Sequence, residues 1–417
     1  MQLIAEPGAL ARAIADQIPT QGNIGVAISG GGDSLALMLA LHQITEARGQ
    51  QLEAMTVDHG LRAEAAAEAD YARRLCQSLS IPHATARWTG WNGDGNLQNA
   101  AREGRYRLIA EWAKRRDLTC VCIGHTLDDV AETFVMRLAR ESGADGLARM
   151  ASDFMRNDVR FLRPMLSIPR EELRQFLKQH KIDWVEDPSN DNEDFDRVRV
   201  RRALAVFKDL GISAENLAAV SENMSQVREV LKTQVQSIGK QIVEQDRGDL
   251  VIDRSGFLDL HFELRRRLLN DALSWISPVS YPLRRNVISD LNEAIEAQRT
   301  FSCNGCLIQS SAKEIRILRE FNAVRELVEF APAWDRWVLE GPWTMGLKVT
   351  ALGEPALAGV ENWRASGLSR QSLMASPAVW KGETLVAAPL AGVGEGWTVR
   401  IRAQDFHSFM TGSAYSH

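Results

Sequence analysis

The chain has 417 residues, of which 45% are hydrophobic, and a formal net charge of −5. This length predicts two or three domains with apolar cores. No apolar run reaches the ~18 residues of a membrane span, and the N-terminus lacks the order of a signal peptide. Five scattered cysteines are typical of reduced thiols, so we expect a cytoplasmic protein without a membrane partner. The net charge does not indicate a nucleic-acid partner, although local basic patches remain open.

The first predicted element is an apolar strand, Ile24–Ile28, that leads through a glycine turn into an Ala/Leu/Met-rich helix. Such a turn places free backbone N–H groups at the positive end of a helix, where phosphate binds. No lysine follows the glycines, so this is not a P-loop. Asp33 stands there instead, and a carboxylate beside phosphates needs a divalent cation between them. The alternative is a plain tight turn capped by Asp33 or Ser34. The predicted nucleotide loop is Ser29, Gly30, Gly31, Gly32, Asp33 and Ser34.

Two further strands, Leu52–Val57 and Thr119–Ile123, alternate with helical stretches. This alternation predicts βαβ units and a parallel sheet, with ligands bound beyond the carboxyl ends of the strands. Asp58 and His59 follow the second strand and are candidates to touch adenine, ribose or metal. The other interpretation of this segment is a turn in which Asp58 caps its own backbone.

The third strand runs into His125 and a predicted helix start that carries Asp129 and Glu132. The two acids are three residues apart, so they share one helix face. Together with Asp33 they suggest a Mg²⁺ site or a general base. A capping box between Thr126 and Asp129 is the structural alternative.

Two groups of arginines are candidate anion contacts. Arg102 and Arg105 share a helix face and are placed to grip phosphate or stack on a base; surface solubility is the alternative. Residues 197–202, which include Arg199 and Arg201, lie at the start of a predicted helix. The amino end of a helix is unfavourable for cations. This segment is therefore expected to meet an anion, ATP or RNA, unless it is a solvated charge run.

The strand–helix alternation, the helical stretch after it and the Gly-, Trp- and Pro-containing C-terminal part predict three domains: an α/β domain over residues 1–205, a mainly helical middle domain over 206–328, and a small α+β domain over 329–417. The helical stretch is expected to run from about Arg202 to Gln298. Cys303-Asn304-Gly305-Cys306 is a lone C-x-x-C, and zinc needs four ligands. We interpret these cysteines as buried and inert, on either side of a turn.

Four motifs occur in order along the chain: Ser-Gly-Gly-Gly-Asp-Ser, Val-Asp-His-Gly-Leu-Arg, the acidic pattern at 125–133, and Glu-Asp-Pro-Ser-Asn with its arginine run. Together they resemble the tRNA(Ile)-lysidine synthetase family of N-type ATP pyrophosphatases (PP-loop enzymes). The match covers about residues 20–205. The resemblance implies a doubly wound, Rossmann-like parallel sheet. It also implies a ligase that uses ATP to adenylate the C2 oxygen of the wobble cytidine of a CAU-anticodon tRNA(Ile), releasing pyrophosphate. The amine of L-lysine then attacks C2 and expels AMP.

The resemblance also implies roles for the candidate residues. Asp33, Asp129 and Glu132 would serve metal binding and activation, with Asp33 and Asp129 as Mg²⁺ ligands. Arg102 or Arg105 would contact the cytosine or the intermediate, and Arg199 or Arg201 the phosphates or RNA. The loop at 29–34, Asp58, His59 and His125 would bind ATP. The last domain would contact tRNA, and a homodimer is left open.

Two other functions are considered. A PP-loop tRNA thiolase would need paired cysteines near the ATP site, but Cys120 and Cys122 are expected to face opposite sides of their strand, and Cys76 stands alone. A nucleotide-binding regulator without catalysis is the third hypothesis, and it requires Asp33 to be dispensable.

Overall fold

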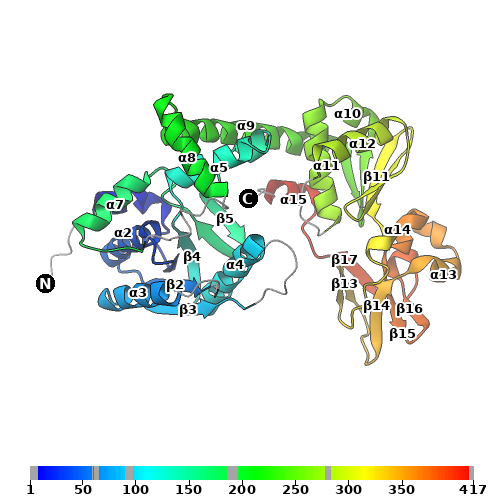
Figure 1. Cartoon of the computed structure of the whole chain (residues 1–417). Helices are drawn as coiled ribbons and strands as arrows, with labels where there is room; N and C mark the ends of the chain where they lie inside the picture. The colour runs from blue at the N-terminus through cyan, green and yellow to red at the C-terminus, as the bar shows by residue number, and fades with distance from the viewer. Residues whose placement is uncertain are drawn as a thin grey trace. The chain divides into compact units, whose positions relative to one another are not determined.

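The computed structural model describes the chain apart from residues 1–7, 59, 61–64, 90–96, 186–195, 278–282 and 413–417. Contacts between residues divide the described chain into two compact units that meet between Arg228 and Glu229. Each unit has its own sheets and apolar cores (Figure 1). Among the described residues, no helix combines the length and the apolar character that a bilayer span requires.

The first unit is built on a six-stranded sheet with the order β3-β2-β1-β4-β6-β5. All neighbouring strands pair in parallel except β5, which runs antiparallel to β6. The predicted strands at 24–28, 52–57 and 119–123 are β1, β2 and β4, which confirms the doubly wound parallel sheet. The strands are β1 (Asn23–Ala27), β2 (Leu52–Asp58), β3 (His83–Arg87), β4 (Leu118–Ile123), β5 (Asp153–Arg156) and β6 (Val159–Leu162).

Helices cover both faces of this sheet. Alternate strand residues point to opposite faces, and apolar residues on each face pack against helices. Ile24 and Val26 of β1 pack into one core with α1, α2, α3 and α7. Val121 and Ile123 of β4 pack into a second core with α4 on the other face. These helices are α1 (Ala9–Ile14), α2 (Gly32–Arg48), α3 (Ala65–Ser78), α4 (Leu97–Arg115) and α7 (Arg170–Gln179).

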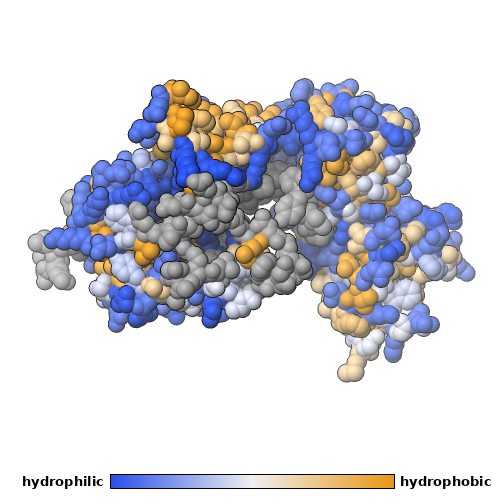
Figure 2. All heavy atoms as spheres, in the orientation of Figure 1, coloured by the Kyte–Doolittle hydropathy of each residue, from blue (hydrophilic) through white to orange (hydrophobic). Residues whose placement is uncertain are grey.

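The remaining helices of the first unit form a smaller core. Phe134 and Val135 of α5 are buried there with Leu217 of α9. Exposed apolar side chains gather over α8 and the start of α9 (Figure 2), among them Val206 and Leu210. Exposed apolar patches are a feature of interaction surfaces; assembly as a homodimer stays a prediction. The helices are α5 (Leu127–Leu138), α6 (Ala144–Leu147), α8 (Asp196–Asp209) and α9 (Ala214–Ile242), the last continuing into the second unit.

The second unit contains the expected helices and, in addition, a five-stranded antiparallel sheet, β7-β8-β11-β10-β9, that the sequence analysis did not place. The hairpin β7–β8 interrupts the helical stretch expected up to residue 298. Its buried positions Leu250 and Ile252 alternate with less buried ones, which is a strand period. The elements are β7 (Val243–Asp246), β8 (Asp249–Asp253), α10 (Arg254–Leu258), α11 (Phe262–Ile276), α12 (Arg285–Glu296), β9 (Phe301–Cys303), β10 (Cys306–Ser310) and β11 (Glu314–Arg319).

The C-terminal part of this unit carries two three-stranded antiparallel sheets and short helices. Its last helix, α15, returns to the five-stranded sheet, where Phe406 and Met410 are buried in the core. The division at residues 205 and 328 stays a prediction. The elements are β12 (Ala333–Trp334), β13 (Trp337–Glu340), β14 (Leu347–Ala351), α13 (Gly353–Ala358), α14 (Arg370–Met374), β15 (Pro377–Lys381), β16 (Thr384–Ala387), β17 (Thr398–Ile401) and α15 (Phe406–Gly412).

The lone C-x-x-C forms the tight turn between β9 and β10. Cys303 and Cys306 pair across the strands, and Asn304 and Gly305 both have positive φ, at 48° and 68°, as a two-residue hairpin turn requires. Burial raises the pKa of Cys303 to about 11 and that of Cys306 to about 12. These shifts favour the protonated thiols at neutral pH. Cys306 is buried, as the sequence interpretation expected, whereas Cys303 is only half-buried.

Gly104 lets α4 approach Trp88. A Cβ at this position would lie 2.2 Å from the Trp88 indole nitrogen, and the indole is buried. We expect Gly104→Ala to destabilise the first unit by about 1–2 kcal/mol, because the clash exceeds alanine's gain in helix propensity. Thermal unfolding followed by circular dichroism measures this. Gly143→Ala is the control, since no atom lies within 4 Å of its Cβ position; equal midpoints for the two variants would contradict the expectation.

Candidate active site

A cavity of about 900 Å³ opens at the carboxyl ends of β1, β2 and β4. Ile28, Asp58 and Gly124, each at or just beyond the end of one of these strands, form part of its wall. This is the edge at which open α/β sheets bind ligands. Its volume lies in the range of small-molecule and nucleotide sites.

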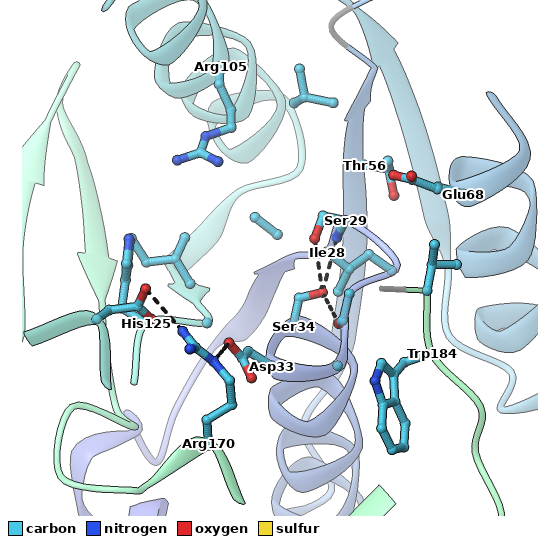
Figure 3. Close-up of a pocket in the computed structure, with 18 of the residues that line it drawn as sticks. Ile28, Ser29, Asp33, Ser34, Thr56, Glu68, Arg105, His125, Arg170 and Trp184 are labelled. Atoms are coloured by element: carbon cyan, nitrogen blue, oxygen red, sulfur yellow. Dashed lines mark hydrogen bonds and ion pairs between the residues drawn. The ribbon is translucent and has the colours of Figure 1, made fainter. Parts of the chain in front are cut away.

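The nucleotide loop forms one side of the cavity. Gly30 has a φ of +84°, which glycine adopts without strain. The Ser34 hydroxyl accepts a hydrogen bond from the Ser29 N–H at 3.1 Å and donates one to the Gly31 carbonyl at 2.8 Å (Figure 3). α2 begins at Gly32, so the first N–H groups of this helix have no partner within it. The local folding is the strand, turn and helix start that the sequence predicts, and it suits a phosphate group.

A short segment after α7 braces this loop from outside. The Val185 N–H donates to the Gly30 carbonyl at 3.2 Å, and a Cβ on Gly32 would lie 3.3 Å from the Trp184 indole. Trp184 also lines the cavity. A larger residue at position 32 would therefore press on the indole, which would have to shift by a few tenths of an ångström.

Three carboxylates converge on one guanidinium beside the loop. Arg170, at the first position of α7, donates to Asp33 Oδ2 at 3.0 Å (Figure 3). Its other nitrogens lie 3.3 Å from Glu132 Oε1 and 3.5 Å from Asp129 Oδ1. Arg201 of α8 also donates to Glu132 Oε1, at 2.7 Å. Asp33, Asp129 and Glu132 are called the acid cluster below.

Asp129 makes two sets of contacts in this arrangement. Its Oδ2 accepts hydrogen bonds from the Thr126 N–H at 2.9 Å and the Thr126 hydroxyl at 3.0 Å, and its own N–H bonds to that hydroxyl. This is the capping box that the sequence analysis gave as the alternative. Its Oδ1 still faces Arg170. The cap fixes the carboxylate in place, and so it positions the acid for the cavity.

Burial and charge shift the titrations of these groups. Burial raises the pKa of the Asp33 carboxyl above its ordinary value, although Arg170 acts in the opposite sense. Burial also acts to raise the pKa of Asp129, but Arg170 and the Thr126 N–H help to hold it below its ordinary value. Burial lowers the pKa of His125 to about 3. At neutral pH this imidazole is uncharged and can accept a hydrogen bond.

Three arginines surround Tyr106, which lines the cavity. The guanidinium carbons of Arg102, Arg105 and Arg156 lie 5.6, 5.7 and 4.2 Å from the centroid of its ring, within cation–π range. The Tyr106 hydroxyl is buried and has no hydrogen-bond partner among the described residues. Arg105 points from α4 into the cavity (Figure 3), whereas Arg102 does not line it.

The cavity is richer in cations than in anions. Four carboxylates line it: Asp33, Asp58, Glu68 and Asp129. Six guanidiniums line it: Arg105, Arg170, Arg174, Arg197, Arg201 and Arg202. Because arginine is the preferred partner of phosphate, this excess suits a polyanionic ligand.

Most of the predicted site residues meet in this cavity. Ser29, Gly31, Gly32, Asp33, Ser34, Asp58, Arg105, His125, Asp129 and Arg201 line it. Gly30 shapes the turn, and Glu132 is buried behind Arg170 and Arg201 with 1% of its side chain exposed. Arg102 and the exposed Arg199 do not line the cavity. His59 and the motif at residues 186–190 lie outside the described residues.

Sequence reasoning missed Arg170 and Trp184. Arg170 had a signal, because it is a cation at a helix start immediately after Pro169. The same argument singled out residues 197–202. Trp184 had none, since its role depends on contacts with a loop about 150 residues earlier in the chain.

The expected orientation of two cysteines was wrong. Cys120 and Cys122 are two residues apart on β4, so they point to the same face, and both are buried in the α2-side core. Neither lines the cavity. Although they share a face, they do not supply exposed thiols at the candidate site.

Comparisons with known proteins identify relatives of this chain. A family model described as a PP-loop domain matches residues 8–207. The chain is 43% identical over 389 residues to the tRNA(Ile)-lysidine synthase of Ruegeria pomeroyi, covering 92% of this chain and 93% of that protein. It is 30% identical over 328 residues to the protein of the same name from Orientia tsutsugamushi, covering 75% and 74%.

Among solved structures, the U34-tRNA thiolase NcsA from Methanococcus maripaludis, determined with its 4Fe–4S cluster, aligns with a TM-score of 0.46 and 18% identity, over 52% of this chain and 78% of that one. The identity and coverage of the Ruegeria protein decide the family. This chain belongs to the tRNA(Ile)-lysidine synthase family and contains a PP-loop domain.

Proposed function

We propose that this chain converts the wobble cytidine of a CAU-anticodon tRNA(Ile) into lysidine, using ATP and L-lysine. The observation that carries the proposal is that the nucleotide loop, the acid cluster and Arg105 meet at one cavity. The family membership supports the same reaction. The cavity supplies both a phosphate cradle and an excess of arginines for a second polyanion.

The residues present fit a Mg²⁺ ion that is shared with nucleotide phosphates. The described residues contain no group of three His, Cys, Asp or Glu side chains arranged to hold a metal alone. Mg²⁺ commonly uses only one or two carboxylates, with phosphates and water completing its shell. Arg170 donates a hydrogen bond to Asp33 Oδ2, while Asp33 Oδ1 has no hydrogen bond among the described residues. Asp33, with Asp129 beside it, would hold the ion, which would stabilise charge on the pyrophosphate leaving group.

The first step forms a bond between the cytosine C2 oxygen and the α-phosphorus of ATP and breaks the α–β phosphate bond. In this step the N–H groups at the start of α2 would hold the departing pyrophosphate. Arg105, which lines the cavity from α4, would contact the base or the adenylated intermediate. Neutral His125 would accept a hydrogen bond from the ribose or adenine without adding charge.

In the second step the lysine amine attacks C2, the bond from C2 to the AMP oxygen breaks, and the amine loses a proton. Because an amine has a reference pKa near ~10.4, this step needs a base. The acid cluster supplies candidates within the cavity wall, and no single member is assigned. Association with tRNA(Ile), use of L-lysine and a cytoplasmic location are part of this proposal.

We expect Asp33→Asn and Asp129→Asn each to lower ATP–pyrophosphate exchange by at least ~100-fold, because each removes a carboxylate that would hold the Mg²⁺ ion that stabilises charge on the pyrophosphate leaving group. Filter binding should show tRNA affinity nearly unchanged. Asp153→Asn is the matched control, since Asp153 pairs with Arg160 on the surface, away from the cavity. Full exchange in both site variants would remove the metal-site assignment.

The activity itself is tested with radiolabelled lysine, bulk tRNA, ATP and Mg²⁺. Acid-stable, ATP-dependent label in tRNA is the expected result. If AMP formation depends on tRNA but no lysine is incorporated into the tRNA, the adenylation step is retained and a nucleophile other than lysine is assigned to the second step. Absence of both would leave the nucleotide-binding regulator as the better account.

A further inference from the structure

Arg170 contacts all three members of the acid cluster. It is 3.0 Å from Asp33 on α2, 3.5 Å from Asp129 and 3.3 Å from Glu132, both on α5. Only 19% of its side chain is exposed. One guanidinium therefore neutralises acids from two helices inside the wall of the cavity.

The backbone around Arg170 is held in place for this contact. Its own N–H donates to Asp128 Oδ2 at 2.7 Å, and the Leu127 N–H donates to the Ile168 carbonyl at 3.1 Å. The starts of α5 and α7 are thus tied to each other. The guanidinium is directed at the acid cluster by two fixed helix ends, and its position does not depend on side-chain packing alone.

This position is costly for a cation. Arg170 stands at the first residue of α7, and the amino end of a helix repels positive charge. The acid cluster compensates, because three carboxylates close together repel one another unless a cation lies between them. Burial acts to lower the pKa of Arg170, but the three carboxylates raise it above its ordinary value. The guanidinium therefore depends on the carboxylates for its stability at this helix start, and the carboxylates depend on the guanidinium to lie close together.

A guanidinium and a divalent cation compete for the same charge. Asp33 Oδ2 is occupied by Arg170, and a divalent ion at Asp33 would lie within a few ångströms of the guanidinium and be repelled by it. Nucleotide phosphates offer the guanidinium an alternative partner with matching geometry.

We propose that Arg170 is a resident counter-cation of the acid cluster. It holds Asp33, Asp129 and Glu132 together while the cavity lacks nucleotide, opposes binding of free Mg²⁺, and transfers to phosphate oxygens when Mg²⁺ arrives with ATP. The inference rests on the proposed function in that Mg²⁺–ATP is the incoming ligand. Arg170 is then a positioning residue that couples metal binding to nucleotide binding.

The test is isothermal titration calorimetry of the full chain with Mg²⁺ in the absence of nucleotide. We expect Arg170→Gln to bind Mg²⁺ at least about tenfold more tightly than the wild-type chain, because a like charge has been removed. The same variant should also need less Mg²⁺ for half-maximal ATP–pyrophosphate exchange, with a lower maximal rate. A purely structural role would weaken metal binding or leave it unchanged.

Arg116→Gln is the matched control. Arg116 also forms a two-point ion pair with a carboxylate, Glu53, at 2.8 and 2.9 Å, but neither residue lines the cavity. Its Mg²⁺ affinity should equal that of the wild-type chain. Mg²⁺ binding by Arg170→Gln that is no tighter than in this control overturns the inference.

If Arg170→Gln does not fold, Arg170→Lys provides the test. Lysine keeps the charge, but one ammonium cannot match the three-carboxylate contact, so its Mg²⁺ affinity should exceed that of the wild-type chain by a smaller factor. Affinity equal to or below wild type would then reject the proposal. The calorimetric titrations involve neither lysine nor tRNA, so their outcome is independent of whether lysidine is formed.

Discussion

The contact between Arg170 and three carboxylates is the interaction on which the cavity depends. It joins α2, α5 and α7, which begin at the same edge of the parallel sheet. Three helix starts at one place create a positive potential, and the three acids offset both this potential and the charge of the guanidinium. Without that balance the nucleotide loop would face either bare carboxylates or an uncompensated cation.

The sequence predicted the parts of the site that are local. A strand, three glycines and an apolar helix lie within 18 residues, from Ile24 to Leu41, and local propensity determines how they fold. The spacing of Asp129 and Glu132 placed both on one helix face, and the structure keeps them on the same guanidinium. The capping box at Asp129 gives a structural role to a residue for which we also propose a function.

The parts that were missed depend on contacts distant in sequence. Arg170 meets Asp33 across 137 residues, and no local pattern encodes that distance. Trp184 is recognised only once the loop it braces is in place. The hairpin β7–β8 was missed for a different reason: its charged residues, such as Glu244 and Asp246, read as a continuation of the helix before it.

The return of α15 to the five-stranded sheet has a consequence for synthesis of the chain. The core of the first sheet on its α2 side uses residues between Leu10 and Leu177, so it can form while later segments are still being translated. The core of the second unit includes Val235 and Met410 and cannot close until α15 has left the ribosome. Since domains fold as units during synthesis, the nucleotide cavity is expected to mature well before the second unit, whose apolar surface then stays exposed for longer.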